Sequence, residues 1–213
     1  MIRLPLAARL PQDNLGRGRT LSIVEGGFAQ VMTSLTSGAA LTGFALLLGA
    51  TPMHIGLMSS LPAFAALAQI TTPYWTHRLG SRRAVTTHML AIARSQWLLI
   101  ALLPVLPLAA ALRPPLLIAI MTAAGALAAI GNTAWMSWLG DLVQRTMRQR
   151  YFANRNLVLG LIGLALGPLV GVYLDLPLWL DDSGKPGPLG FMILFVVGTV
   201  IGWVSIAILR RIV

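Results

Sequence analysis

The sequence predicts an all-α, polytopic membrane protein with six transmembrane helices. The chain has 213 residues, of which 56% are hydrophobic and only 10% charged, and its mean hydropathy is +0.78. A soluble domain usually carries about 25% charged residues. The apolar residues also fall into six long stretches, and about 20 such residues cross the hydrocarbon core of a bilayer. We expect approximate helices over residues 21–49, 55–75, 84–112, 115–139, 156–174 and 189–209.

The basic residues lie at the ends of these stretches and predict the orientation of the chain. Thirteen of the sixteen Lys and Arg residues fall in four segments: 1–20, 78–83, 145–155 and 210–211. Short loops rich in Lys and Arg stay in the cytoplasm, so both termini are expected there, with residues 1–20 as a cytosolic basic tail. The net charge of +10 then points to anionic lipid headgroups of the bilayer and not to nucleic acid. The strong preference for Arg over Lys suggests a GC-rich bacterium, hence its cytoplasmic (inner) membrane.

The first two expected helices contain few charges but several informative residues. From Gly26 to Thr76 there is no Asp, Glu, Lys or Arg. The first helix carries polar residues at helical spacing, which place them on one face and serve either helix packing or a water-filled path. These residues are Gln30, Thr33, Ser34 and Ser37. Pro52 is expected to break the chain in a short turn before the second helix, and Pro62 is expected to kink that helix.

The remaining four helices follow from the same pattern. The third contains Arg94 and Gln96, and the fourth ends in a polar and aromatic stretch that includes Asn132. The fifth follows the basic loop 145–155, and the sixth has no charged residue before Arg210. Tryptophans at the end of the fourth helix are expected in the interfacial belt of the membrane.

Two ionisable residues fall inside the expected helices, and each costs roughly 2.5–3.5 kcal/mol at mid-helix. Glu25 lies about 6 Å into the first helix and Arg94 about 15 Å into the third, at about 1.5 Å per residue. They could form an ion pair or contact an anionic solute. Alternatively, Glu25 balances the basic tail at the interface and Arg94 extends to the surface. The candidate residues for substrate or coupling-ion binding are Glu25, Gln30, Ser34, Arg94, Gln96 and Asn132.

The loop between the second and third expected helices resembles a signature of the major facilitator superfamily, a family of secondary transporters. The matching residues are Arg78, Gly80, Arg82 and Arg83. The family pattern differs at Pro73, His77 and Ser81, where it has a Gly, an Asp and an Arg. Independently of the family, Gly80 permits the positive φ of a tight turn. The arginines suit lipid phosphates and the carbonyl ends of helices.

Two further stretches are similar to the same family. Gly163, Gly167, Pro168 and Gly171 resemble the fifth-helix motif of its antiporter branches, with glycines on one face that allow close helix approach. The stretch from Trp135 to Arg155 resembles the end of the fourth helix and the loop that follows it. Together these resemblances cover about residues 20–211.

This resemblance implies a fold, a function and a partner. Members have two six-helix halves, each a pair of three-helix inverted repeats, so the chain is expected to be an N-terminal half. A second half would follow in cis if the chain is truncated, or bind in trans if the transporter is split. The implied function is secondary active transport of a small solute, with or without a proton or other coupling ion. The implied cytoplasmic gating network is His77, Arg78, Gly80, Arg82, Arg83, Asp141 and Arg148.

A membrane protein of this composition could also be an assembly partner or an enzyme. A non-transporting assembly partner with the same fold remains the main alternative. A membrane enzyme would need a Ser–His or paired-Asp arrangement within the helices, and the sequence places none there. The chain has no Cys, and His54 and His88 have no companion ligands nearby, so neither a metal site nor a cofactor is expected.

Overall fold

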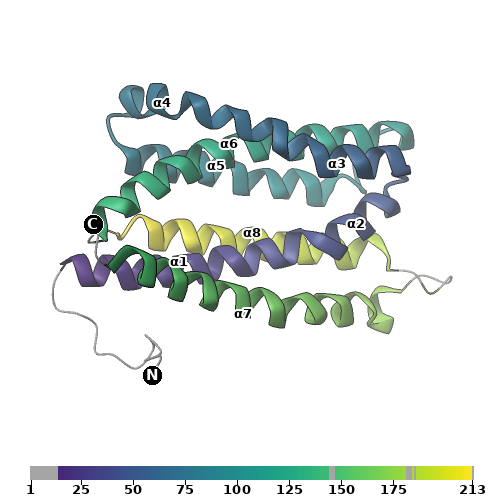
Figure 1. Ribbon diagram of the computed structural model, residues 1–213. Helices are drawn as coiled ribbons and strands as arrows, with labels where there is room; N and C mark the ends of the chain where they lie inside the picture. The colour runs from purple at the N-terminus through teal and green to yellow at the C-terminus, as the bar shows by residue number, and fades with distance from the viewer. Residues whose placement is uncertain (1–13, 144–146, 181–183, 185, 213) are drawn as a thin grey trace.

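The described part of the chain is an all-helical bundle. The computed structural model describes residues 14–143, 147–180, 184 and 186–212, without the side chains of residues 14, 15, 141 and 142. Apart from one isolated β-bridge between Leu180 and Pro186, the regular structure of these residues is helical. The long helices lie side by side along one direction, and α1 begins at the same end at which α8 finishes (Figure 1). The predicted all-α class is therefore confirmed.

The long rods of the bundle are made from eight α-helices and three 3₁₀ segments of the described chain. Two rods are composite: α2 continues α1, and α3, η2 and α4 follow one another without a loop. The elements are α1 (Asn14–Thr36), α2 (Gly38–Leu47), α3 (Pro52–Ala65), η2 (Ala66–Thr71), α4 (Thr72–Leu79), α5 (Arg82–Leu102), η3 (Ala110–Leu112), α6 (Arg113–Leu142), α7 (Arg148–Leu174), η5 (Pro177–Trp179) and α8 (Pro188–Leu209).

Four helical segments of the described chain are long and apolar enough to cross a membrane. They are Pro52–Leu79, Ala110–Gly140, Arg148–Leu174 and Pro188–Leu209. These segments indicate a membrane-embedded protein. The other two expected spans are present as helices but are more polar. α1 carries Glu25 and two arginines and is interrupted at Ser37, while α5 carries Arg94 beside Gln96. Six crossings therefore stay a prediction.

Two helix boundaries in the first half of the chain differ from the expected ones. α1 begins at Asn14 and not at residue 21, so the end of the expected tail is helical, while residues 1–13 lie outside the described chain. α5 ends at Leu102, well before the expected residue 112. Pro104 and Pro107 follow it closely, and proline cannot continue the backbone hydrogen bonding of a helix.

The start of α7 differs from the expected residue 156, and this difference changes the position of one arginine. The sequence placed Arg155 in a basic cytoplasmic loop, but α7 begins at Arg148, so Arg155 lies two turns inside a helix. An isolated basic cluster indicates only that a chain segment is near the cytoplasm; it does not exclude that the segment is already helical. This shift carries a cationic side chain into the bundle.

The packing of the helices leaves two rods on the outside. α5 packs against both α6 and α8, α1 packs against α8 and α7, and α3 with η2 packs against α6. Fully buried Phe44, Ile100 and Phe195 form the centre of the largest apolar cluster. In the apolar windows of Pro52–Leu79 and Arg148–Leu174, only 11% of residues are buried, against 44% in α8. The α3–α4 rod and α7 therefore expose the most surface to lipid or to a partner.

Close packing of α5 on α6 predicts a contrast between two helical glycines. A Cβ at Gly131 would lie 2.9 Å from Cγ of Leu90 and 3.3 Å from Cβ of Met89, whereas a Cβ at Gly160 meets nothing within 4 Å. We expect Gly131→Ala to lower the free energy of unfolding by about 1–3 kcal/mol through overpacking. Gly160→Ala should raise it by up to about 1 kcal/mol, because alanine favours helix. Unfolding in mixed detergent micelles measures both. Equal values for the two variants would contradict this packing.

Candidate functional site

A buried ion pair joins the first and third spans that the sequence expected. Nη2 of Arg94 in α5 lies 3.4 Å from Oε1 of Glu25 in α1. Glu25 is only 3% exposed. Of the interpretations that the sequence left open for these two residues, the structure contains the ion pair. A carboxylate and a guanidinium in the interior of a bundle require each other, because either charge alone would be costly to bury.

The α8 helix supplies further partners to this pair. The Ser205 hydroxyl lies 2.7 Å from Oε1 and 3.1 Å from the backbone oxygen of Glu25, and Nη1 of Arg94 donates to the carbonyl of Gly202 at 2.8 Å. A Cβ at Gly202 would overlap Sδ of Met32 and lie 3.2 Å from Cδ of Arg94, so the glycine makes room for both side chains. Three helices thus meet at one polar centre, and no sequence motif singles out Gly202 or Ser205.

Glu25 lies deeper along its helix than the sequence indicated. It follows the first residue of α1, Asn14, by eleven positions, which at 1.5 Å per residue is about 16 Å. The expected depth of about 6 Å assumed a helix that starts at residue 21. Arg94 follows the start of α5 by twelve positions, about 18 Å. Both charges therefore lie near the middle of the bundle and not at its surface.

A second arginine enters the same region from α7. The guanidinium of Arg155 lies over the ring of Trp135 in α6, 4.5 Å from its centroid, and interacts electrostatically with Glu25. Its Nε is buried and has no hydrogen-bond partner among the described residues. Sequence reasoning missed both residues, because it placed Arg155 in a loop and Trp135 in the interfacial belt. Arg148 and Arg155 share a helical face at a spacing of seven, which could have indicated that Arg155 points into the bundle.

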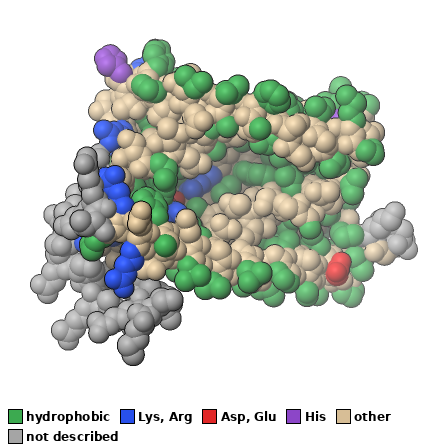
Figure 2. Space-filling view, viewed as in Figure 1, with side chains coloured by type: hydrophobic (Ala, Val, Ile, Leu, Met, Phe, Trp, Pro, Cys, Tyr) green, Lys and Arg blue, Asp and Glu red, His purple; other side chains and the backbone are tan. Residues whose placement is uncertain are grey.

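These charged residues line a small cavity of about 220 Å³. Its walls come from α1, α5, α6 and α7. The residues that line it are Glu25, Ala29, Leu90, Arg94, Asn132, Trp135, Met136 and Arg155. Figure 2 shows blue side chains deep in the hollow across the middle of the molecule, well apart from those at its end. Two guanidinium groups and one carboxylate therefore line one small, partly open cavity.

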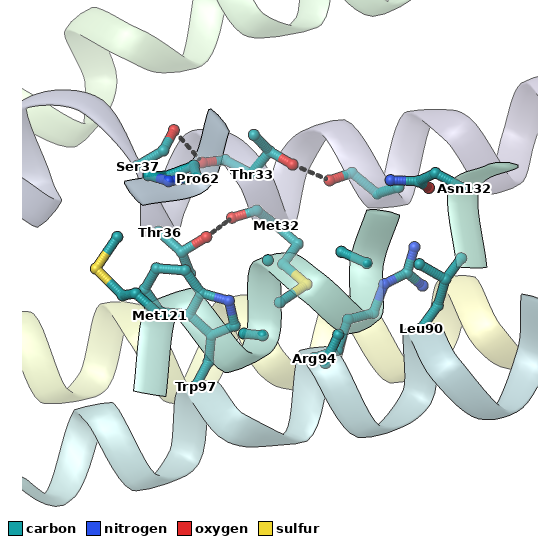
Figure 3. A pocket seen from close by; sticks show the side chains of 15 residues that line it. Met32, Thr33, Thr36, Ser37, Pro62, Leu90, Arg94, Trp97, Met121 and Asn132 are labelled. Atoms are coloured by element: carbon teal, nitrogen blue, oxygen red, sulfur yellow. Dashed lines mark hydrogen bonds between the residues drawn. The ribbon is translucent and has the colours of Figure 1, made fainter. Parts of the chain in front are cut away.

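A larger cavity of about 370 Å³ adjoins the first. Ala29, Leu90, Arg94 and Asn132 line both, so the two cavities are contiguous. The larger one lies between α1, α3, α5 and α6. Arg94 and Asn132 lie at one end of it, and Trp97 and Met121 lie toward the other (Figure 3). Its charged end and its mostly apolar remainder give the combined cavity two chemically distinct parts.

The predicted polar face of α1 is divided between two surroundings. Thr33 and Ser37 line the larger central cavity, and their hydroxyls donate to the carbonyls of Ala29 and Thr33, at 3.0 and 2.6 Å. Gln30 and Ser34 instead line a separate cavity of about 510 Å³ between α1 and α7.

Only some of the six binding candidates meet. Glu25, Arg94 and Asn132 line the small charged cavity, whereas Gln30 and Ser34 face α7, because the helical twist turns them away. Gln96 lines neither central cavity; its Oε1 is buried without a hydrogen-bond partner among the described residues. Three of the six candidates therefore lie together at the charged cavity and three lie elsewhere, and a role of any of them in binding stays a prediction.

The basic cluster around Gly80 connects helix ends. Gly80 has φ +74° and caps the C-terminus of α4, as its conformational freedom predicted. Arg82 donates to the carbonyl of Ser137 at 3.4 Å, and Arg83 donates to the carbonyl of Arg210. Arg78 instead donates to the hydroxyl of Tyr74 on its own helix, at 2.9 Å. Cations at the C-terminal carbonyls of α6 and α8 complement the helix dipoles.

Arg148 of α7 also donates to the C-terminal carbonyls of a neighbouring helix. It donates to the carbonyls of Gly140 and, at 3.3 Å, Val143 at the end of α6. The side chain of Asp141, which the sequence placed in this network, lies outside the described residues. His77 is exposed and lines a groove together with Arg82. Figure 2 shows several blue side chains at the end of the bundle where α4 meets α5. A gating role of this cluster in transport stays a prediction.

The glycine motif of α7 approaches a neighbouring helix at one position. A Cβ at Gly163 would lie 2.9 Å from Nε2 of Gln30, so α1 and α7 are close there. At Gly167 and Gly171 an added Cβ meets nothing within 4 Å, and Pro168 is exposed. Among the described residues, close helix approach is therefore present at Gly163, and for Gly167 and Gly171 it stays a prediction. This face of α7 is open.

Comparison of the chain with protein-family models, curated proteins and solved structures finds no match. Among the described residues there is also no group of three or more His, Cys, Asp or Glu residues that could hold a metal ion. The chemistry of the central cavity is therefore argued from its own residues, and these are the charges of Glu25, Arg94 and Arg155 and the apolar surface beside them.

Proposed function

We propose that this chain is a six-helix half of a secondary active transporter, which moves a small solute across a bacterial cytoplasmic membrane by alternating access. The observation that carries the proposal is the contiguous central cavity with Glu25, Arg94 and Arg155 at its polar end. Ionisable groups inside membrane proteins face cavities and mark the pathways of solutes and ions. A bundle whose only role was attachment would have no need to place three charges around one interior cavity.

The packing of the helices supports an inverted-repeat origin. α1 packs on α8 as α6 packs on α5, and α1 packs on α7 as α6 packs on α3. Exchange of the first three rods with the last three therefore reproduces these main contacts, and α5 on α8 is its own counterpart, although the smaller α4–α5 contact has no α7–α8 equivalent of similar size among the described residues. Transporters of the major facilitator type are built from repeats of this kind, with the solute site near the membrane midplane. This symmetry favours the resemblance to that superfamily and six crossings.

The two outer rods are the expected contact surface for a second half. The α3–α4 rod and α7 are equivalent under the exchange of repeats, and both are the least buried of the apolar helices. The open glycine face around Gly167 and Pro168 belongs to this surface. We propose that another six-helix unit covers it, either later in the same chain or in a separate one. The end of the bundle that carries the Arg82, Arg83 and Arg148 contacts would face the cytoplasm, with both termini.

Accessibility of the cavity tests transport without knowledge of the solute. The chain contains no cysteine, so Asn132→Cys introduces a single thiol into the cavity wall. In right-side-out and inside-out vesicles we expect a membrane-impermeant maleimide to label this thiol from both sides, because alternating access opens the cavity to each side in turn.

The matched control is Val200→Cys in the middle of the exposed face of α8, which should stay unlabelled from both sides because it would face lipid. Each variant is expressed as the full chain, with its second half where one exists. If the thiol at position 132 reacts from one side only, or from neither, alternating access is wrong, and an assembly partner of the same fold becomes the better interpretation.

A further inference from the structure

We infer that the solute is an organic anion, whose carboxylate or similar head binds Arg155 and Arg94 and whose apolar body occupies the adjoining cavity. That the anion is a transported solute rests on the proposed function. The anion-binding site itself is argued from the residues that form it. The sequence allowed an anionic solute at Arg94, but it placed Arg155 outside the membrane, so a site with two arginines emerges only from the structure.

The charges that line the small cavity do not balance. Glu25 is engaged by Arg94 at 3.4 Å and by the Ser205 hydroxyl at 2.7 Å. Arg155 has no ion pair within 4.0 Å among the described residues, and its Nε has no hydrogen-bond partner there. Burying an arginine in a membrane bundle is unfavourable unless it is paired. One positive charge of the cavity is therefore available to an anion that enters it.

Arg155 lines the small cavity, although its Nε is buried. Its Cζ lies over the ring of Trp135, 4.5 Å from the centroid, and this contact uses none of the N–H donors. Gly26 permits this position, because a Cβ there would lie only 2.5 Å from Nη2 of Arg155. A planar guanidinium held in this way is suited to a carboxylate or phosphate, which it binds through two parallel hydrogen bonds. The Asn132 amide lines the same cavity and adds a neutral donor.

The adjoining cavity adds a requirement for an apolar body. Its volume of about 370 Å³ lies in the range of small-molecule sites. Met32, Pro62, Trp97 and Met121 supply most of its large side chains. Arg94 and Asn132 join this space to the charged cavity (Figure 3). An anion with an aromatic or aliphatic body would fill both parts at once, whereas a small inorganic anion would leave the larger part empty.

Benzoate and its uncharged isostere benzamide separate charge from shape. The full chain is reconstituted in nanodiscs of phosphatidylcholine and titrated calorimetrically with each probe. We expect benzoate to bind at least tenfold more tightly than benzamide and more tightly than acetate, which lacks the body. Arg155→Gln should weaken benzoate binding at least tenfold, and Arg155→Lys by less, because lysine keeps the charge but not the planar fork. Arg150→Gln removes an exposed arginine of the same helix and should leave affinity unchanged.

Adjacent glycines provide a second test that leaves every charge in place. Gly26→Ala should displace Arg155 and weaken benzoate binding severalfold, since the new Cβ would overlap its guanidinium. Gly27→Ala is the matched control, because a Cβ there lies at an ordinary 3.5 Å from Cδ1 of Ile162. Benzamide that binds as tightly as benzoate, or unchanged benzoate affinity in both Arg155→Gln and Gly26→Ala, would overturn the inference.

A lipid headgroup is the other source of the same chemistry, and the membrane composition tests it. If benzoate binds several times more weakly in nanodiscs with phosphatidylglycerol, the headgroup competes for Arg155, and the anion site is supported with a lipid occupant. Equal affinity in both membranes supports a free organic anion. The inference and the transport proposal can fail separately. Benzoate binding without two-sided labelling at position 132 would show an anion site without transport. Two-sided labelling without benzoate binding would show transport of a solute that is not an anion.

Discussion

Replacing Glu25 by alanine is expected to lower the free energy of unfolding by about 3–5 kcal/mol, because removal of one partner strands a buried charge. The carboxylate is the acceptor for Arg94 at 3.4 Å and for Ser205 at 2.7 Å. Arg155 also interacts with it electrostatically. Without Glu25, both guanidinium groups would lie in the bundle with no anion. Unfolding by sodium dodecyl sulfate in mixed micelles, followed by tryptophan fluorescence, measures the loss.

Controls for this prediction come from the same chain. Asp175 is an exposed acid at the end of α7, so Asp175→Ala should change stability by less than about 0.5 kcal/mol. A double-mutant cycle with Arg94→Gln should show a coupling of at least about 1 kcal/mol, since contacting residues are not additive. If Glu25→Ala stays within 0.5 kcal/mol of the parent protein, the polar centre does not stabilise the bundle as described.

The sequence was sufficient for the class of the protein because membrane insertion depends on local composition. Long apolar segments have to be helical in lipid, since every backbone polar group must be satisfied within the segment. The same local logic predicted the left-handed turn at Gly80 and the contacts of Arg82 and Arg83 with helix ends. The sequence predicted the helix ends less well. Pro104 and Pro107 account for the early end of α5, and Gly38, with φ +60°, follows the break at Ser37. α7 starts at Arg148 and not at the expected residue 156.

The candidate site could be predicted only where a residue was unusual in its own segment. Glu25 and Arg94 stood out because charges are rare inside apolar helices. Ser205 did not, because a hydroxyl in α8 is ordinary, and its role depends on contact with a residue 180 positions away. Arg155 was missed for another reason: near the end of a span, an arginine can point out to phosphates or in along the helix. That choice is made by Gly26 and Trp135 in other helices.

Filling the junction of the two cavities is expected to abolish transport while the protein stays folded. Ala29 of α1 lines both the charged and the apolar cavity. The side chain of Ala29→Phe would occupy this junction, so an anion could no longer reach Arg155 and extend into the larger space. In the Asn132→Cys background we expect labelling from at least one side to fall more than tenfold, together with a similar loss of benzoate affinity.

Ala207→Phe makes the same change in size on the exposed face of α8 and should leave labelling and affinity as they were. The pair separates the site from general damage, because an overpacked bundle loses stability, whereas a blocked cavity loses access at normal stability. Unfolding of both variants therefore has to be measured beside labelling. If Ala29→Phe folds normally and position 132 is still labelled from both sides, the solute takes another path, and the contiguous cavity of α1, α5 and α6 is not that path.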